Sequence, residues 1–182
     1  IFGGTFNPTH FGHLRSAEEV REAQRLDRVV FIPSASPPHK SRAQLAAAEH
    51  RLAMVRHALA GNPYFRFSRI EIERGGPSYS VDTLAALRGT YPQVRFAFIL
   101  GIDAFRDIAA WMDYERIFSL CDLIVTSRPG YSQPPLDSML PVAARRQFCY
   151  RRSRQVLEHR SGHRIVFQAI SEVAISASDI RG

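Results

Sequence analysis

Lysine is nearly absent from this basic chain. Lys40 is the only lysine among 24 Lys and Arg residues, and the formal net charge is +7. A basic protein favours phosphate-bearing partners, whether nucleotides or nucleic acid. The arginine bias extends along the whole sequence, however, and no stripe of basic and aromatic residues of the kind that binds single strands is visible. The charge alone supports a phosphate ligand only weakly, and we predict no nucleic-acid partner.

Cysteine and long apolar runs are also scarce. Cys121 and Cys149 have neither metal-ligand spacing nor a partner motif, so we expect free thiols in a reducing cytoplasm. His10 and His13 are three residues apart, but no thiolate or carboxylate cluster accompanies them, so we predict no metal-ligand residues. No apolar run approaches the length of a membrane span, so we predict a cytoplasmic protein without a membrane partner.

A chain of 182 residues is long enough to bury a core, and we expect a single domain over residues 1–182. The sequence begins at Ile1 with what resembles a strand already under way. It stops at Gly182 in what resembles the start of a helix. We therefore expect that both ends are trimmed.

Strand-like and helix-like segments alternate along the chain. Strands are predicted at the end of "IFGG" and over 28–33, 64–74, 94–101, 122–127 and 164–170. Helices are predicted over 12–26, 49–61, from Ser80 onward, 102–121 with a break near Trp111, 142–160, and at the entry to "SASDIRG". Strands separated by helices predict an α/β fold with an open, mainly parallel sheet. Ligands bind at the carboxyl ends of strands in such sheets, where the opening motif, "GIDAF" and the loop after "DLIVTS" are predicted to meet.

The opening stretch "IFGGTFNPTHFGH" places two glycines and two histidines where a strand becomes a helix. Gly3 and Gly4 allow the backbone to approach a ligand closely, and a helix N-terminus offers free N–H groups to an anion. At positions i and i+3, His10 and His13 share one helix face and can donate hydrogen bonds to phosphoryl oxygens. The alternative is that His13 is a core histidine and His10 a helix cap. We favour the phosphate site.

Two motifs at opposite ends of the chain resemble those of one enzyme superfamily. "GGTFNPTHFGH" resembles the first motif of the (H/T)xGH nucleotidylyltransferases, and "ISASDIR" resembles their second motif. The resemblance implies a Rossmann-like fold with helices on both faces of the sheet. It also implies transfer of a nucleoside monophosphate from a nucleoside triphosphate to a phosphate-bearing acceptor.

Within that superfamily the chain most resembles the bacterial nicotinate mononucleotide adenylyltransferases. The stretches that carry this resemblance are "PPHK" (37–40), "PSYSVDTL" (77–84), "GIDAF" with Trp111, and "LIVTSRPGY" (123–131). One departure is Asn7, where bacterial members commonly carry Asp. The resemblance implies an enzyme that joins ATP and nicotinate mononucleotide in NAD biosynthesis, with Mg²⁺ bound mainly through the ATP phosphates and the possibility of a homo-oligomer.

The resemblance also implies functional residues. The catalytic residues would be His10, His13, Lys40 and Arg181. The ATP-binding residues would be Gly3, Gly4, Thr5, His10, His13, Lys40, Gly101, Asp103, Arg128, Ser178 and Arg181. The residues that bind nicotinate mononucleotide would be Tyr79, Ser80, Val81 and Trp111.

Each of these residues has a plainer interpretation. Lys40 alone would be a surface lysine, Trp111 a core anchor, and Ser80 or Asp103 a helix N-cap. Arg128 is a weak candidate in an arginine-rich chain, while Ser178 and Arg181 alone would be a capped helix with a surface arginine. Two other functions stay open. One is a pantetheine-phosphate-type adenylyltransferase, against which His10 and Trp111 argue, and the other is a non-catalytic nucleotide-sensing module.

Overall fold

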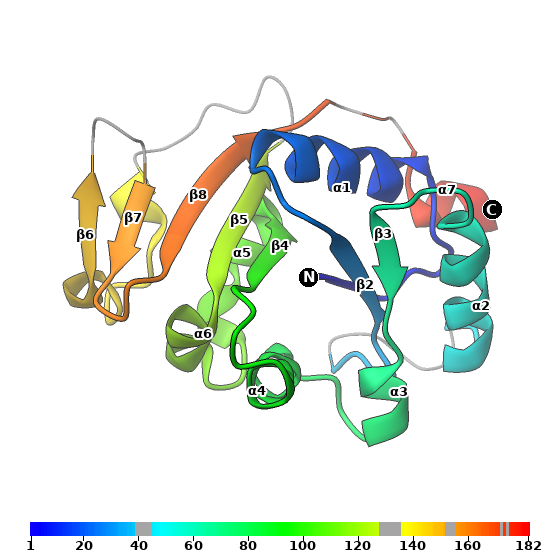
Figure 1. The fold of residues 1–182 in the computed structure, drawn as a ribbon, viewed down its shortest axis with the longest axis horizontal. Helices are drawn as coiled ribbons and strands as arrows, with labels where there is room; N and C mark the ends of the chain where they lie inside the picture. The colour runs from blue at the N-terminus through cyan, green and yellow to red at the C-terminus, as the bar shows by residue number, and fades with distance from the viewer. Residues whose placement is uncertain (39–44, 128–135, 152–155, 172, 174) are drawn as a thin grey trace. The chain divides into compact units, whose positions relative to one another are not determined.

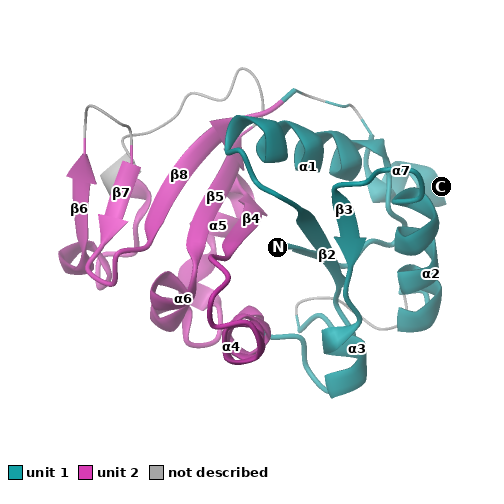
Figure 2. Cartoon of the chain, viewed as in Figure 1, with its two compact units in different colours: residues 1–79, 171–182 teal, residues 80–170 magenta. Residues whose placement is uncertain are grey.

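The computed structural model of this chain describes residues 1–38, 45–127, 136–151, 156–171, 173 and 175–182. These residues form two compact units. Unit 1 comprises Ile1–Tyr79 and Ser171–Gly182, and unit 2 comprises Ser80–Ile170 (Figure 2). Each unit has its own strands and helices.

Unit 1 contains a parallel three-stranded segment of sheet in the order β3-β2-β1, of which β2 and β3 are labelled in Figure 1. Its strands are β1 (Phe2–Gly4), β2 (Val29–Pro33) and β3 (Phe65–Phe67). Its helices are α1 (Phe11–Ala23), α2 (Ala48–Ala58), α3 (Ile70–Arg74) and α7 (Ala177–Arg181). Helices α2 and α3 both pack on β2, which is buried along most of its length, as its continuous apolar sequence requires.

The register of β1 and β2 places their carboxyl ends side by side. Gly4 lies opposite Pro33, and the N–H of Ser34 donates to the carbonyl of Gly4 at 2.9 Å. The two loops that follow these strands therefore leave the sheet together. This is the edge at which ligands bind in parallel α/β sheets.

Unit 2 contains three parallel strands followed by two antiparallel ones, in the order β4-β5-β8-β7-β6. The strands are β4 (Ala97–Gly101), β5 (Asp122–Ser127), β6 (Phe148–Arg151), β7 (Val156–His159) and β8 (Arg164–Ala169). The helices are α4 (Ser80–Thr90), α5 (Ile102–Arg106) and α6 (Tyr114–Leu120), with short 3₁₀ turns η2 (Ile108–Ala110), η3 (Leu136–Met139) and η4 (Arg145–Gln147). Helix α5 packs on β4 and β5, and α4 packs on α6. The predicted break near Trp111 is confirmed, because Trp111 has an extended backbone between η2 and α6.

The prediction of a strand over 64–74 is wrong in its second half. Only Phe65–Phe67 is a strand, and Ile70–Arg74 forms α3. Ser68 accepts the N–H of Ile70 through its hydroxyl, and Arg69 pairs with Glu73 at 3.1 Å across one helical turn. These local contacts favour a helical turn in spite of the alternating sequence pattern.

The prediction of a helix over 142–160 is also wrong. Residues Phe148–Arg151 and Val156–His159 form the antiparallel strands β6 and β7. Val156 pairs with Val166 of β8, and His159 is buried against the ring of Phe148, with centroids 4.9 Å apart. Val166 lies outside the segment predicted as a helix, so strand pairing overrides the helix propensity of the arginine-rich segment.

Candidate active site

The loop after β1 has a tightly packed beginning. Phe6 is 2% exposed and has a positive φ of 49°. A Cβ atom on Gly4 would lie 3.1 Å from the Phe6 ring, closer than most side chains approach each other. Gly4 is therefore glycine because the loop folds the Phe6 ring back over the end of β1.

His10 and His13 form a local pair at the start of α1. His10 occupies the N-cap position, and its backbone N–H donates to Nδ1 of His13 at 3.3 Å. The two rings lie with centroids 3.8 Å apart. Because Nδ1 of His13 accepts a hydrogen bond, the neutral ring carries its proton on Nε2. The suggestion that His10 is a helix cap is therefore correct for its position, and it is compatible with a functional role.

Gly12 is the glycine between the two histidines, and the structure gives a reason for it. A Cβ atom there would lie 3.0 Å from Nδ1 and 3.1 Å from Cε1 of His10. The ring of His10 therefore packs directly on the backbone at Gly12. This contact explains the spacing H-x-G-H in steric terms.

The environment of His10 favours the neutral form of its ring. Burial lowers the pKa of His10 below its ordinary value of 6.5. Its Nδ1 atom and the hydroxyl oxygen of Thr9 are buried and have no hydrogen-bond partner among the described residues. Buried polar atoms of this kind are normally satisfied by water or by a ligand.

The second motif contacts the first one. Ser176 is the N-cap of α7, and its hydroxyl accepts the N–H of Asp179 at 3.1 Å. Arg181 donates to the backbone carbonyl of Asn7 and, at 3.3 Å, to the hydroxyl of Ser178. The interpretation of Ser178 as a helix cap is wrong, because Ser176 has that position.

Both motifs also line one cavity of about 570 Å³ in unit 1. Pro8, Thr9 and His10 contribute from the first motif, and Ile175, Asp179 and Ile180 from the second. A cavity of this volume is within the range of small-molecule sites. Of the predicted site residues, unit 1 contains Gly3, Gly4, Thr5, His10, His13, Ser178 and Arg181, and among these His10 lines the cavity.

Unit 2 carries the predicted residues Ser80, Val81, Gly101, Asp103 and Trp111, while Tyr79 belongs to unit 1. Helix α4 begins at Ser80, and α5 follows directly after Gly101, which is its N-cap. The alternative that Asp103 caps this helix is wrong, and its side chain is exposed. Trp111 is only partly buried and lies edge-on to Phe98, so one part of the indole remains accessible. Lys40 and Arg128 lie outside the described residues.

Three contributors to this region were missed from the sequence. The side chains of Arg51, Asn7 and Ser78 hold the loops of unit 1 by hydrogen bonds to backbone groups. Arg51 could have been noticed, because it lies four residues before Val55 on the apolar face of α2, where a charged residue is out of place. Asn7 and Ser78 carried no comparable signal.

Two further findings concern metals and membranes. Within the described ranges, no group of three or more His, Cys, Asp or Glu side chains could hold a metal ion. The same residues contain no helix with the length and apolar character needed to cross a membrane.

The fold and the paired motifs define an α/β protein of the nucleotidyltransferase class. The chain belongs to the cytidylyltransferase-like family, whose model matches residues 1–182. It is 51% identical to proteins named "Probable nicotinate-nucleotide adenylyltransferase" from Geotalea daltonii and from Geobacter sulfurreducens. Each match covers 100% of this chain and 84% of the relative.

Solved structures support the fold. The nicotinic acid mononucleotide adenylyltransferase of Plasmodium falciparum, complexed with NaAD, has a TM-score of 0.72 at 17% identity, over 99% of this chain and 80% of that one. The predicted family, the α/β fold class and the predicted enzyme class are therefore confirmed. The assignment of a role to each site residue stays a prediction, as do the single domain, a homo-oligomer and the cytoplasmic location.

Proposed function

We propose that this chain transfers the adenylyl group of ATP to nicotinate mononucleotide, giving nicotinate adenine dinucleotide and pyrophosphate. The observation that carries the proposal is the contact between the two motifs, in which Arg181 binds the backbone of Asn7. The names of relatives that are about half identical over the whole chain support the same reaction.

The proposed reaction depends on the positions of the two substrates and on groups that stabilise negative charge. The 5′-phosphate oxygen of the acceptor attacks the α-phosphorus of ATP in line, and pyrophosphate leaves. Nε2–H of His13 donates to an α-phosphoryl oxygen, where negative charge accumulates. Burial lowers the pKa of His10 and so favours its neutral ring, which can act as a hydrogen-bond donor or acceptor.

Lys40, Ser178 and Arg181 hold the leaving pyrophosphate in this proposal. The described hydrogen bonds of Arg181 go to two backbone carbonyls and one hydroxyl, and they use three of the five N–H groups of a guanidinium. The remaining N–H groups suit a phosphate. Gly101, Asp103 and Arg128 complete the proposed ATP contacts.

The acceptor is recognised by its ring and its carboxylate. Trp111 offers a flat, partly accessible face for the pyridine ring. Tyr79, Ser80 and Val81, where α4 begins, receive the nicotinate carboxylate, with the backbone N–H groups of Ser80 and Val81 as donors, because the N–H of Tyr79 donates to the carbonyl of Pro77. Nicotinamide has a neutral amide in place of the carboxylate, so it would lack the favourable interaction of a negative charge with these N–H groups.

Mg²⁺ is the proposed cofactor. Bound to the ATP phosphates, it neutralises the charge of the triphosphate. An ion held mainly by substrate oxygens and water needs no carboxylate cage, so we assign no protein ligands to it.

The test is an assay of pyrophosphate release with purified protein, ATP and Mg²⁺, and one acceptor at a time. Nicotinate mononucleotide should be used, with kcat/KM at least about tenfold above that for nicotinamide mononucleotide. Faster turnover with 4′-phosphopantetheine would replace the proposal by the pantetheine-phosphate reaction. Binding of ATP without turnover of any acceptor would support the nucleotide-sensing module instead.

A further inference from the structure

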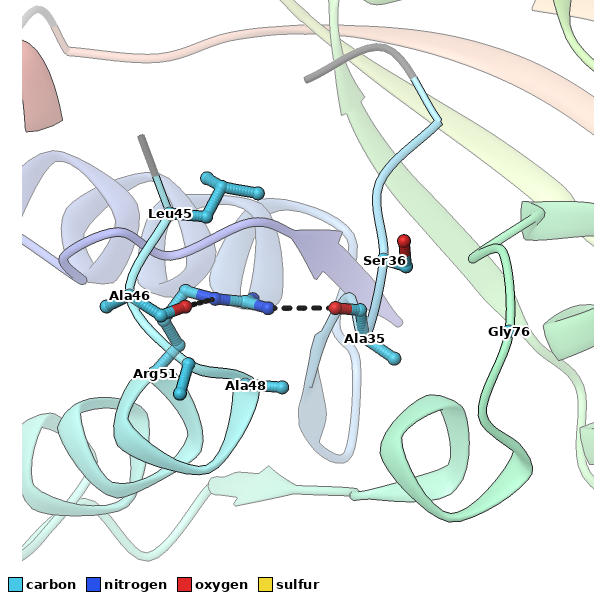
Figure 3. Close-up of a pocket in the computed structure, with 8 residues that line it drawn as sticks. Ala35, Ser36, Leu45, Ala46, Ala48, Arg51 and Gly76 are labelled. Atoms are coloured by element: carbon cyan, nitrogen blue, oxygen red, sulfur yellow. Dashed lines mark hydrogen bonds between the residues drawn. The ribbon is translucent and has the colours of Figure 1, made fainter. Parts of the chain in front are cut away.

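Arg51 is a buried arginine that the proposed chemistry does not use. Its side chain is 1% exposed, in α2, and it hydrogen-bonds to three backbone carbonyls. Nε donates to Ala46 at 3.0 Å, Nη1 to Thr5 at 2.8 Å and Nη2 to Ala35 at 3.1 Å. Figure 3 shows the guanidinium between the segments that carry Ala35 and Ala46, beside a cavity of about 330 Å³.

The three carbonyls belong to separate parts of unit 1. Thr5 follows β1 in the first motif, Ala35 lies two residues after β2, and Ala46 lies two residues before α2. A guanidinium is planar and its donors have fixed directions, so it sets the relative positions of all three backbone segments at once. A lysine ammonium, a point charge on a flexible stem, cannot reproduce that arrangement.

Burying the charged side chain of Arg51 costs free energy, and packing alone does not explain why a charged residue is present there. Burial lowers the pKa of Arg51, while the carboxylate of Glu71 opposes this effect. Removing the partners of a buried charged group is strongly destabilising. Replacing the charged group itself by an apolar residue of similar volume, however, often leaves the folded protein equally stable. The three directed hydrogen bonds therefore suggest a geometric requirement.

The contacts continue from Arg51 to both motifs. The N–H of Ala46 donates to Oδ1 of Asn7 at 3.1 Å, so Ala46 is held on both its polar backbone atoms. The carbonyl of Asn7 accepts from Arg181 of the second motif. On the other side, the Ser78 hydroxyl accepts the N–H groups of Ala35 at 2.8 Å and Ser36 at 3.2 Å.

We propose that Arg51 is a positioning residue for ATP. Arg51 fixes the position of the backbone at Thr5 relative to the segments at Ala35 and Ala46 and, through Asn7, relative to Arg181. This inference rests on the proposed adenylyl transfer. Arg51 acts through backbone groups and does not itself touch the substrate. Its loss should therefore change how ATP is bound and oriented in a protein that remains folded.

The first test compares Arg51→Lys with Arg56→Lys. Arg56 lies in the same helix and is exposed, so it is a matched control for the same chemical change. Thermal unfolding establishes the temperature at which each variant is folded, and kcat and the KM for each substrate are then measured below it. Arg51→Lys should lower kcat/KM for ATP by about tenfold or more, because small displacements of reacting groups have large effects on rate. Arg56→Lys should match wild type.

A residue with only a structural role would lower the unfolding temperature and leave kcat and KM of the folded protein unchanged. That result for Arg51→Lys would overturn the proposal. Calorimetric titration with ATP separates this outcome from failure of the proposed function. A wild type that binds ATP but adenylates no acceptor refutes the reaction, and the ATP affinity of Arg51→Lys still tests the positioning role.

Asn7 provides a second test if Arg51→Lys does not fold. Asn7→Ala removes the acceptor for Ala46, whereas Asn7→Asp keeps an oxygen at that place. Folded Asn7→Ala should bind ATP more weakly than Asn7→Asp does. Wild-type ATP affinity in folded Asn7→Ala would show that this network does not position the nucleotide.

Discussion

The backbone N–H of His10 donates to Nδ1 of His13, and the two rings lie 3.8 Å apart between centroids. One nitrogen of His13 thus has a structural role at the start of α1. The other nitrogen, Nε2, carries the proton that the proposed mechanism directs at the α-phosphoryl group. The two roles can be separated by substitution.

His13→Asn keeps an acceptor near the position of Nδ1 and removes the donor at Nε2. We expect the free energy of unfolding to stay near that of wild type, whereas His13→Ala should lower it by about 1 kcal/mol through the lost hydrogen bond. Both variants should lower kcat by about a hundredfold, as loss of one oxyanion-type donor does. Denaturant unfolding and pyrophosphate release measure the two effects, with exposed His50→Asn as the control. Wild-type turnover in folded His13→Asn would contradict the role of Nε2.

Gly12→Ala should reduce activity without the usual gain in helix stability. Its Cβ would lie 3.0 Å from the His10 ring and displace it, so we expect a lower kcat and no increase in the free energy of unfolding. Gly89 is a matched control, because it is an exposed helical glycine with nothing within 4 Å of an added Cβ. Gly89→Ala should stabilise the protein by about 0.5 kcal/mol and leave turnover unchanged. If Gly12→Ala and Gly89→Ala change turnover and the free energy of unfolding in the same way, displacement of the His10 ring has no effect on either quantity.

Stability should fall on the acid side because of His159. Burial, together with Arg160 and His163, lowers the pKa of His159 below 6.5. Nδ1 of its ring lies 2.7 Å from the hydroxyl oxygen of Ser161, and Nε2 lies 3.1 Å from Oε1 of Gln147. The unfolded chain takes up the proton first as the pH falls. The stability that the neutral ring contributes is therefore full above about pH 6.5 and is lost as the pH falls through the lower folded pKa.

The measurement is the free energy of unfolding between pH 8 and pH 5, in about half-unit steps. His159→Gln should give a shallower decrease below pH 6.5 than wild type does, whatever its absolute stability. His57→Gln changes an exposed histidine on α2 and should keep the wild-type slope. A slope that is the same in all three proteins would show that His159 does not contribute to acid destabilisation.

The two cysteines should differ in reactivity. Burial raises the pKa of Cys121 to about 12, and its side chain is 1% exposed, whereas Cys149 is exposed on β6. Because the thiolate is the reactive form, a disulfide reagent at about pH 8 should label one thiol quickly in the native protein and the second only after unfolding. Cys149→Ser should abolish the fast phase, and Cys121→Ser should keep it. Rapid labelling of both thiols in the native protein would contradict the burial of Cys121.

The sequence by itself determined the two motifs, most of the parallel strands and the family. These features are local: a strand buried on both faces is a short apolar run, and Gly4 and Gly12 each lie against a ring two residues away in the chain, Phe6 and His10 respectively. His10 and His13 form a local pair because His13 lies three residues after His10, the N-cap of α1. Each of these features depends on a few neighbouring residues, so a single sequence is sufficient to find it.

Only the tertiary structure decided which distant groups complete the site. The strands β6 and β7 replace a predicted helix because β8 supplies the partner of β7, and β7 in turn pairs with β6. Arg51 meets Thr5 and Ala35 across loops, and Arg181 meets Asn7 across almost the entire chain. A hydrogen bond to a backbone carbonyl requires no particular residue type at the acceptor, so the acceptors leave no pattern in the sequence, and these contacts arise only when the chain has folded.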